Sequence, residues 1–534
     1  MPKRLFFLKL LVALGLGGLM TLGFAPFNWG YGVPVLLALF LLLLRGEQGK
    51  RTFMLGTGFG FGFFTFGIAW VHISLHQFGG ASLGLSMGMA MLLALYLALY
   101  YGVLAWIVGR SKLGLVMTYG FLFPVVGVLL ELVRAHLFTG FPWLALGYSL
   151  TEMPFAPFLF STMGALLSSF WVYFVAGILV LFVLQFAMKI VLARQVRLSG
   201  SDERKSDENV GRETLLRFPL LYGLLLAGIV GIAYEWIGEP IEPSGKPVRA
   251  GLLQGNISQD AKFHDDFIYH TLDTYFDLIA KVSDRVDLIV MPETAIPIVY
   301  DGRDGVSAHF HRLAELDNAD IISGIFTGDR LKERFRNGLV HYGKSDQTDH
   351  FYEKYRLLPF GEYIPFRGIL SHFNDWVEIP YSDLEAGQKE QAPFQFRSTE
   401  AKGSASICYE AVFGDMLRYQ AGQSEFLINV SNDAWFGESI GPWQHLQIAR
   451  ARSIELARPM IRATNTGVTA IIDHQGKILG VLPQFETDAL VGEFQPMTGL
   501  TAYAKLGDGM WILILLGVSG LMVFVTKRYA RRLP

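Results

Sequence analysis

Cysteine is almost absent from this sequence, which has one in 534 residues. A single thiol cannot form an internal disulfide, so a disulfide-stabilised scaffold is excluded. Net charge is also nearly absent: 45 basic and 47 acidic residues give −2, so the chain lacks the basic excess typical of nucleic-acid binding. Charged residues make up 17% and hydrophobic residues 51%. This composition is too apolar for a water-soluble domain and too charged for a bundle of membrane helices alone. It predicts a chain with one part in the membrane and another in water.

Long hydrophobic runs are missing from residues 247–498 but dominate the chain on both sides of that block. Most of these runs have close to the ~20 residues that cross a hydrocarbon layer of ~30 Å. Eight membrane spans are predicted, at residues 6–26, 31–44, 53–74, 83–109, 114–133, 159–188, 218–237 and 509–526. The predicted parts are a seven-span domain at 1–237, a catalytic block at 247–498, a final span at 509–526 and a tail at 527–534.

Lysine and arginine are absent from two short loops between predicted spans, residues 27–30 and 75–82. The alternate loops are basic, as at Arg45, Lys50 and Arg51. Because cytoplasmic loops retain basic residues, both termini are predicted to be cytoplasmic and the 247–498 block extracytoplasmic. Reading the first span as a cleaved signal peptide is disfavoured, since no A-x-A site follows it.

The 247–498 block has short apolar runs rich in β-branched residues, which predict buried strands. These runs lie at 248–254, 287–292, 319–326, 404–409 and 426–431. Helical patterns lie between several of them, as at 267–282 and 444–456. Strands and helices that alternate in this way predict an α/β domain with a largely internal sheet.

Reactive side chains follow three of these predicted strands, where the sheet edge favours a cleft. They are Glu293, Cys408 and the pair Asn432–Asp433, and Lys354 lies in a fourth, aromatic-rich segment. Each has an ordinary structural explanation when taken alone: a small buried hydrophobe for Cys408, a helix N-terminal carboxylate for Glu293 and a solvated cation for Lys354. Together they supply the nucleophile, base and cation that acyl transfer requires.

The roles follow from the residue types. A thiol with an ordinary pKa of ~8.5 is mostly protonated at neutral pH, so it needs a base to remove its proton. Glu293 is the predicted base. Lys354 is predicted to favour the thiolate and, with the backbone N–H of Tyr409, to stabilise the oxyanion that forms on an attacked carbonyl.

Four motifs carry a family resemblance: PETA around Glu293, YEKYRLLPFGEYIP around Lys354, CYE at 408–410 and SNDAWFG at 431–437. In this order they resemble the nitrilase superfamily, whose Glu-Lys-Cys triad on an αββα sandwich works through a thioester. With the eight predicted spans and the motifs GFAPF and GFPWLALGYS, the whole chain resembles the membrane-anchored apolipoprotein N-acyltransferase family of Gram-negative bacteria.

The resemblance implies that Glu293 is the proton acceptor, Lys354 the oxyanion-stabilising cation and Cys408 the nucleophile. It also implies supporting roles for further residues, which are Glu362, Tyr409, Glu410, Trp435 and Arg458. The implied reaction moves a fatty acyl chain from a phospholipid to the N-terminal amine of a diacylglyceryl cysteine on an apolipoprotein, in a ping-pong cycle. The implied location is the bacterial inner membrane with the catalytic domain in the periplasm. No metal and no cofactor are expected.

Other expectations concern details and alternatives. Phe263 stands where the family favours tryptophan, and the loop at 358–376 is a predicted lid. Glu131 and Arg134 are spaced for a local ion pair, with lipid headgroup contact as the alternative. The competing functions are a membrane-anchored amidohydrolase acting on small amides and a transporter or assembly subunit with an inactive outer domain.

Overall fold

The computed structural model describes residues 3–199, 210–259, 262, 265–302, 305–329, 334–343, 349–363 and 383–530. The chain forms two compact units. The first, called the helical unit, comprises residues 1–69, 89–237 and 506–534; the second, called the sandwich unit, comprises residues 70–88 and 238–505. Phe263 and most of the predicted 358–376 lid lie outside the described residues.

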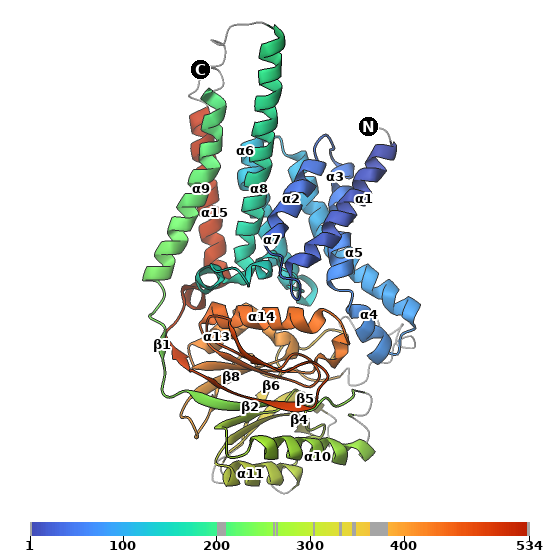
Figure 1. Cartoon of the computed structure of the whole chain (residues 1–534), viewed down its shortest axis with the longest axis vertical. Helices are drawn as coiled ribbons and strands as arrows, with labels where there is room; N and C mark the ends of the chain where they lie inside the picture. The colour runs from blue at the N-terminus through green and yellow to red at the C-terminus, as the bar shows by residue number, and fades with distance from the viewer. Residues whose placement is uncertain are drawn as a thin grey trace. The chain divides into compact units, whose positions relative to one another are not determined.

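The helical unit is made mainly of long apolar helices (Figure 1). These are α1 Lys3–Met20, α2 Gly32–Leu43, α3 Lys50–Gly67, α5 Leu83–Arg110, α7 Phe123–His136, α8 Ala156–Ser199, α9 Val210–Trp236 and α15 Ala502–Ala530. In the described part of the chain, six helices are long and apolar enough to cross a membrane, or seven if the bent pair Lys50–Gly67 and Val71–Phe78 is one span. Helix α2 has only 12 residues. The prediction of a multi-pass helical part is therefore confirmed, but the count of eight spans stays a prediction.

A buried polar cluster lies within the helical unit. The Glu131 carboxylate accepts hydrogen bonds from the Ser169 hydroxyl at 2.6 Å, the Tyr173 hydroxyl at 2.9 Å and the Leu146 N–H at 3.2 Å. The Arg134 guanidinium donates instead to two backbone carbonyls of the following loop, at 2.8 and 2.6 Å. Glu131 and Arg134 thus form their hydrogen bonds with other groups, and not with each other as predicted. These hydrogen bonds join the loop after α7 to the helices.

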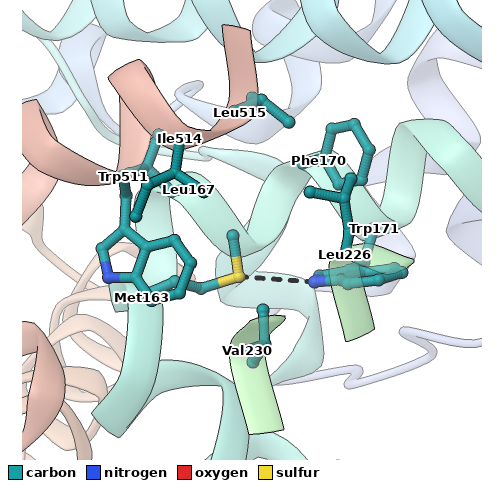
Figure 2. Close-up of a pocket in the computed structure, with 9 residues that line it drawn as sticks. All are labelled: Met163, Leu167, Phe170, Trp171, Leu226, Val230, Trp511, Ile514 and Leu515. Carbon is teal, nitrogen blue, oxygen red and sulfur yellow. Dashed lines mark hydrogen bonds between the residues drawn. The ribbon is translucent and has the colours of Figure 1, made fainter. Parts of the chain in front are cut away.

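The helical unit also contains a small pocket between α8, α9 and α15 (Figure 2). The nine residues that line it are all apolar or aromatic. Within it the Trp171 indole N–H donates to the Met163 sulfur at 3.3 Å. Because its walls carry neither a nucleophile nor a base, this pocket is not a reaction site.

The sandwich unit contains two six-stranded sheets. In spatial order, the first has β13 Asp488–Phe494, β2 Val248–Gln254, β3 Leu288–Val290, β4 Asp320–Asp329, β5 Arg334–Tyr342 and β6 His350–Glu353. The second has β12 Ile478–Val481, β11 Ala470–Ile472, β10 Met460–Thr464, β9 Phe426–Ser431, β8 Lys402–Ile407 and β7 Phe394–Gln395. The central strands β2–β3–β4 and β8–β9–β10 are parallel. A separate two-stranded ladder joins β1 Glu242–Pro243 to β14 Met497–Thr498.

Alternating side chains place these sheets face to face. In β2, Ala250 and Leu252 pack into the core between the sheets, whereas Leu253 packs on the opposite face, against helices. Helices α10 Asp265–Val282 and α11 Val306–Leu316 cover the first sheet, and α13 Gly414–Ala421 and α14 Gly441–Leu456 cover the second (Figure 1). The predicted αββα sandwich is confirmed.

The 70–88 segment belongs to the sandwich unit although it lies in sequence between α3 and α5. It contains α4 Val71–Ile73 and a π-helical turn at Ser74–Phe78. The Trp70 indole N–H donates to Gln444 at 3.3 Å, and the Ser74 hydroxyl donates to the backbone carbonyl of Trp435 at 2.6 Å. The segment is therefore anchored on α14 and on the loop that follows β9.

Candidate active site

Three strand ends bring the predicted triad together. Glu293 follows β3, Lys354 follows β6 and Cys408 follows β8. The Lys354 ammonium lies 3.2 Å from one oxygen of Glu293 and 2.9 Å from one oxygen of Glu362. The charges of Glu293 and Lys354 both act on the Cys408 thiol. All of these side chains are buried.

Two further groups hold the Glu293 carboxylate. The Asn337 side-chain amide donates to Glu293 Oε1 at 2.7 Å and to Glu362 Oε1 at 2.9 Å. The backbone N–H of Asn432 donates to Glu293 Oε2 at 2.8 Å. Asn432 is at a predicted strand end, but sequence reasoning misses Asn337. Its signal is a buried amide side chain in the middle of β5, a strand whose other central residues are mostly apolar.

The backbone of Glu293 is fixed as firmly as its side chain. Buried Lys262 donates to the Glu293 carbonyl oxygen at 3.0 Å and to the Thr294 hydroxyl at 2.8 Å. Burial lowers the pKa of Lys262 to about 7, partly opposed by the charge of Glu293. A Cβ on Gly324 would lie 2.3 Å from the Pro292 oxygen, so only glycine lets β4 approach this turn so closely. Lys262 is a second residue that sequence reasoning misses.

Burial and nearby charges set the resting protonation of the site. Burial alone would lower the pKa of Lys354, but Glu293 and Glu362 raise it well above its usual value, so the ammonium stays charged. Burial raises the pKa of the Cys408 thiol, Glu293 raises it further, and Lys354 offsets only part of this rise. Cys408 therefore rests as a thiol, and the lysine does not by itself produce the predicted thiolate.

Glu410 joins the nucleophile to the segment that carries Lys354. Cys408 and Glu410 lie in one 3₁₀ turn, which begins at Cys408. The φ of Cys408 is +50°, in the left-handed region. One oxygen of Glu410 accepts from the N–H groups of residues 355–356, at 2.8 and 3.0 Å. The other accepts from the Ile407 N–H at 2.7 Å and the Tyr352 hydroxyl at 2.8 Å. Glu410 thus fixes the nucleophile relative to its cation.

The remaining predicted residues divide by position. The Tyr409 ring packs edge-on against Phe413 beside the nucleophile, with ring centroids 5.2 Å apart. Trp435 lies in the loop after β9 and packs on Phe78 of the 70–88 segment, with ring centroids 5.0 Å apart. Buried Arg458 donates to backbone carbonyls of residues 424, 421 and 499, at 2.7, 3.0 and 2.8 Å. Arg458 therefore joins loops and takes no position beside the triad carboxylates.

Comparisons with known proteins match both units. A family model described as Apolipoprotein N-acyltransferase N-terminal domain matches residues 16–178, and one described as Carbon-nitrogen hydrolase matches residues 249–503. The Apolipoprotein N-acyltransferase of Pasteurella multocida is 35% identical over 546 residues, which cover 99% of this chain and 98% of that protein. The chain belongs to the apolipoprotein N-acyltransferase family. Proteins of the same name from Pseudomonas aeruginosa and Haemophilus influenzae are 36% and 34% identical, over 93% and 97% of this chain and 91% and 95% of theirs.

Membership in the apolipoprotein N-acyltransferase family, together with the apolar helices, identifies the chain as a membrane protein. The match extends through both units. A small-amide hydrolase resembles only the carbon–nitrogen hydrolase part, so that alternative is not favoured.

Proposed function

We propose that this chain transfers a fatty acyl chain from a phospholipid to the N-terminal amine of the diacylglyceryl cysteine of an apolipoprotein. The observation that carries the proposal is the meeting of Glu293, Lys354 and Cys408 in one buried site. This site lies in a chain that matches proteins named Apolipoprotein N-acyltransferase along nearly its whole length.

In the first half-reaction, the Cys408 sulfur attacks an ester carbonyl of the phospholipid while Glu293 takes the thiol proton. Negative charge then develops on the carbonyl oxygen, where Lys354 and the Tyr409 N–H stabilise it. The C–O bond breaks, Glu293 returns the proton to the departing alkoxide, and a lysophospholipid leaves. The acyl chain remains on Cys408 as a thioester.

In the second half-reaction, the free amine of the lipoprotein attacks the thioester carbonyl. Glu293 takes a proton from the attacking nitrogen, and the same donors stabilise the second oxyanion. The C–S bond breaks, Glu293 protonates the sulfur, and the amide product leaves. Because one site serves both substrates in turn, the kinetics are ping-pong.

A membrane anchor suits these substrates. Extracting a lipid into water costs ~0.8 kcal/mol for each exposed CH₂ group, which a catalyst at the bilayer avoids. We place the chain in the bacterial inner membrane, and the alternation of basic and non-basic loops supports an orientation with the sandwich unit in the periplasm and both termini in the cytoplasm. A reporter active only in the cytoplasm, fused after Gly245, should be inactive; activity would contradict this orientation.

The direct test is mass spectrometry of the purified protein after exposure to phospholipid vesicles. We expect a fatty acyl adduct on the Cys408 peptide, discharged by a peptide that begins with diacylglyceryl cysteine. The Cys408→Ser variant is the control, and it should carry no thioester and transfer no acyl chain. Lipoprotein acylation at the normal rate by Cys408→Ser would disprove the mechanism.

A further inference from the structure

A second set of polar side chains lies buried behind the nucleophile and has no role in the reaction described above. Its members come from the end of β9, from α14 and from β10. They are Ser431, Asp433, His445 and Arg462, each no more than 1% exposed. Buried polar groups of this kind are costly unless they are paired, so their partners show what the arrangement holds in place.

Ser431 hydrogen-bonds to the Cys408 thiol, whereas His445 reaches the backbone of the nucleophile. Its Nε2 atom lies 3.1 Å from the backbone carbonyl oxygen of Cys408. A carbonyl oxygen can only accept, so Nε2 must carry a proton. Burial lowers the pKa of His445, as does the charge of Arg462, and Asp433 opposes this only in part. The ring is therefore neutral, with its proton on Nε2.

Asp433 and Arg462 fix that ring. Nδ1 of His445 lies 3.0 Å from the Arg462 guanidinium, which donates to it when the ring proton is on Nε2, and 3.0 Å from Asp433 Oδ1. The same guanidinium donates to Asp433 Oδ2 at 2.8 Å, and the Ser431 hydroxyl donates to Asp433 Oδ1 at 2.6 Å. A Cβ on Gly467 would lie 2.4 Å from a carboxylate oxygen of Asp433, so the carboxylate is also tightly enclosed.

The carbonyl that His445 binds belongs to the peptide unit that carries the Tyr409 N–H. In a planar trans peptide, the C=O and the following N–H point in opposite directions. A hydrogen bond to the Cys408 oxygen from behind therefore turns the Tyr409 N–H toward the opposite side. That N–H is the oxyanion donor of the proposed reaction, and Cys408 holds it through a left-handed backbone that a non-glycine residue adopts only when constrained.

We propose that His445 is a positioning residue for the oxyanion site: by holding the Cys408 carbonyl, it aims the Tyr409 N–H at the developing oxyanion. Asp433 and Arg462 hold the His445 ring in the position from which Nε2 reaches this carbonyl. This inference rests on the proposed acyl transfer, and it assigns to buried α14 a part in the chemistry as well as in the packing.

The test compares two reactions of Cys408, which is the only thiol in the sequence. Acylation by phospholipid vesicles passes through an oxyanion, whereas alkylation by iodoacetamide displaces iodide at a saturated carbon and forms none. In His445→Leu the donor is lost. We expect acylation to slow about 10²- to 10³-fold, the loss typical of one oxyanion donor. Alkylation should stay within about threefold of wild type, because a neutral side chain has been replaced and the thiol environment is little changed.

His445→Gln is the matched variant, since its side-chain amide can donate from nearly the same place. It should recover most of the acylation rate lost in His445→Leu. Equal acylation by His445→Leu and wild type would overturn the inference, as would a parallel fall in acylation and alkylation, which indicates general disorder of the site. If wild type itself gives no acyl adduct, the proposed function fails, and that result is separate from either outcome for the variants.

Discussion

Replacing Lys354 by methionine would leave Glu293 and Glu362 buried without the ammonium that they share. The two lost ion pairs have N–O distances of 3.2 and 2.9 Å. At an effective dielectric constant of about 20, opposite charges at such distances attract by about 5 kcal/mol. Desolvation of the ammonium offsets much of that attraction, and removing one partner of a buried pair typically costs about 3–5 kcal/mol. We therefore expect Lys354→Met to lose stability on this scale.

For a domain of this size such a loss lowers the unfolding temperature by about 6–20 °C. Thermal unfolding of the purified protein in detergent measures it, with Lys281→Met as the matched control. Lys281 pairs with Asp488 at 3.6 Å, and both side chains are more than half exposed, so that variant should lose less than about 1 kcal/mol.

Adding Glu362→Gln to Lys354→Met removes one of the uncompensated charges and should restore part of the loss. A double variant less stable than Lys354→Met would refute the electrostatic reasoning.

Three further predictions concern the site and its support. Asn337→Ala should lower kcat/KM for acyl transfer about 10- to 100-fold, because hydrogen bonds to charged groups contribute about 1.5–3 kcal/mol; an unchanged value would show that Asn432 and Lys354 hold Glu293 without it. The raised pKa of Cys408 leaves little thiolate at neutral pH, so its alkylation rate should climb continuously from pH 6 to pH 9, and a plateau below pH 8 would contradict a resting thiol. Arg458→Met should lower the unfolding temperature because five backbone carbonyls lose a buried donor, while folded protein should alkylate at the normal rate; slow alkylation would place Arg458 in the site.

Much of the fold follows from local patterns in the sequence. The run at 248–254 is β2 with the predicted bounds, and the run at 426–431 is β9. Both are short, apolar and flanked by polar residues, so burial on both faces decides their conformation. The number of membrane spans is harder to predict from hydropathy. Helix α2 is short, and the axis of the chain turns by 60° between α3 and the helix that follows it. Length and composition alone do not tell a short span from a helix that ends within the layer.

The site could be predicted where a reactive residue stood at the end of a predicted strand or within a distinctive motif. Glu293 and Cys408 met the first condition, Lys354 was recognised from its aromatic-rich segment, and motif order supported all three. Asn337 and His445 met neither condition, because each serves another residue across a sequence distance of 44 or 37 positions. No local pattern reveals such a partner. Their shared signal is a polar side chain inside an element that tertiary packing buries on all sides.

The 70–88 segment bears on how the catalytic part can be studied in isolation. Expressing residues 238–505 alone would produce a fragment without Trp70 and Ser74, which bind Gln444 and the Trp435 carbonyl in the intact chain. Such a fragment would expose Trp435 and Phe436, whose rings pack on Phe78 and Trp70. A faithful water-soluble version has to graft residues 70–88 back onto this block, so the shortest gene segment that encodes the hydrolase-like fold is not the smallest complete folding unit.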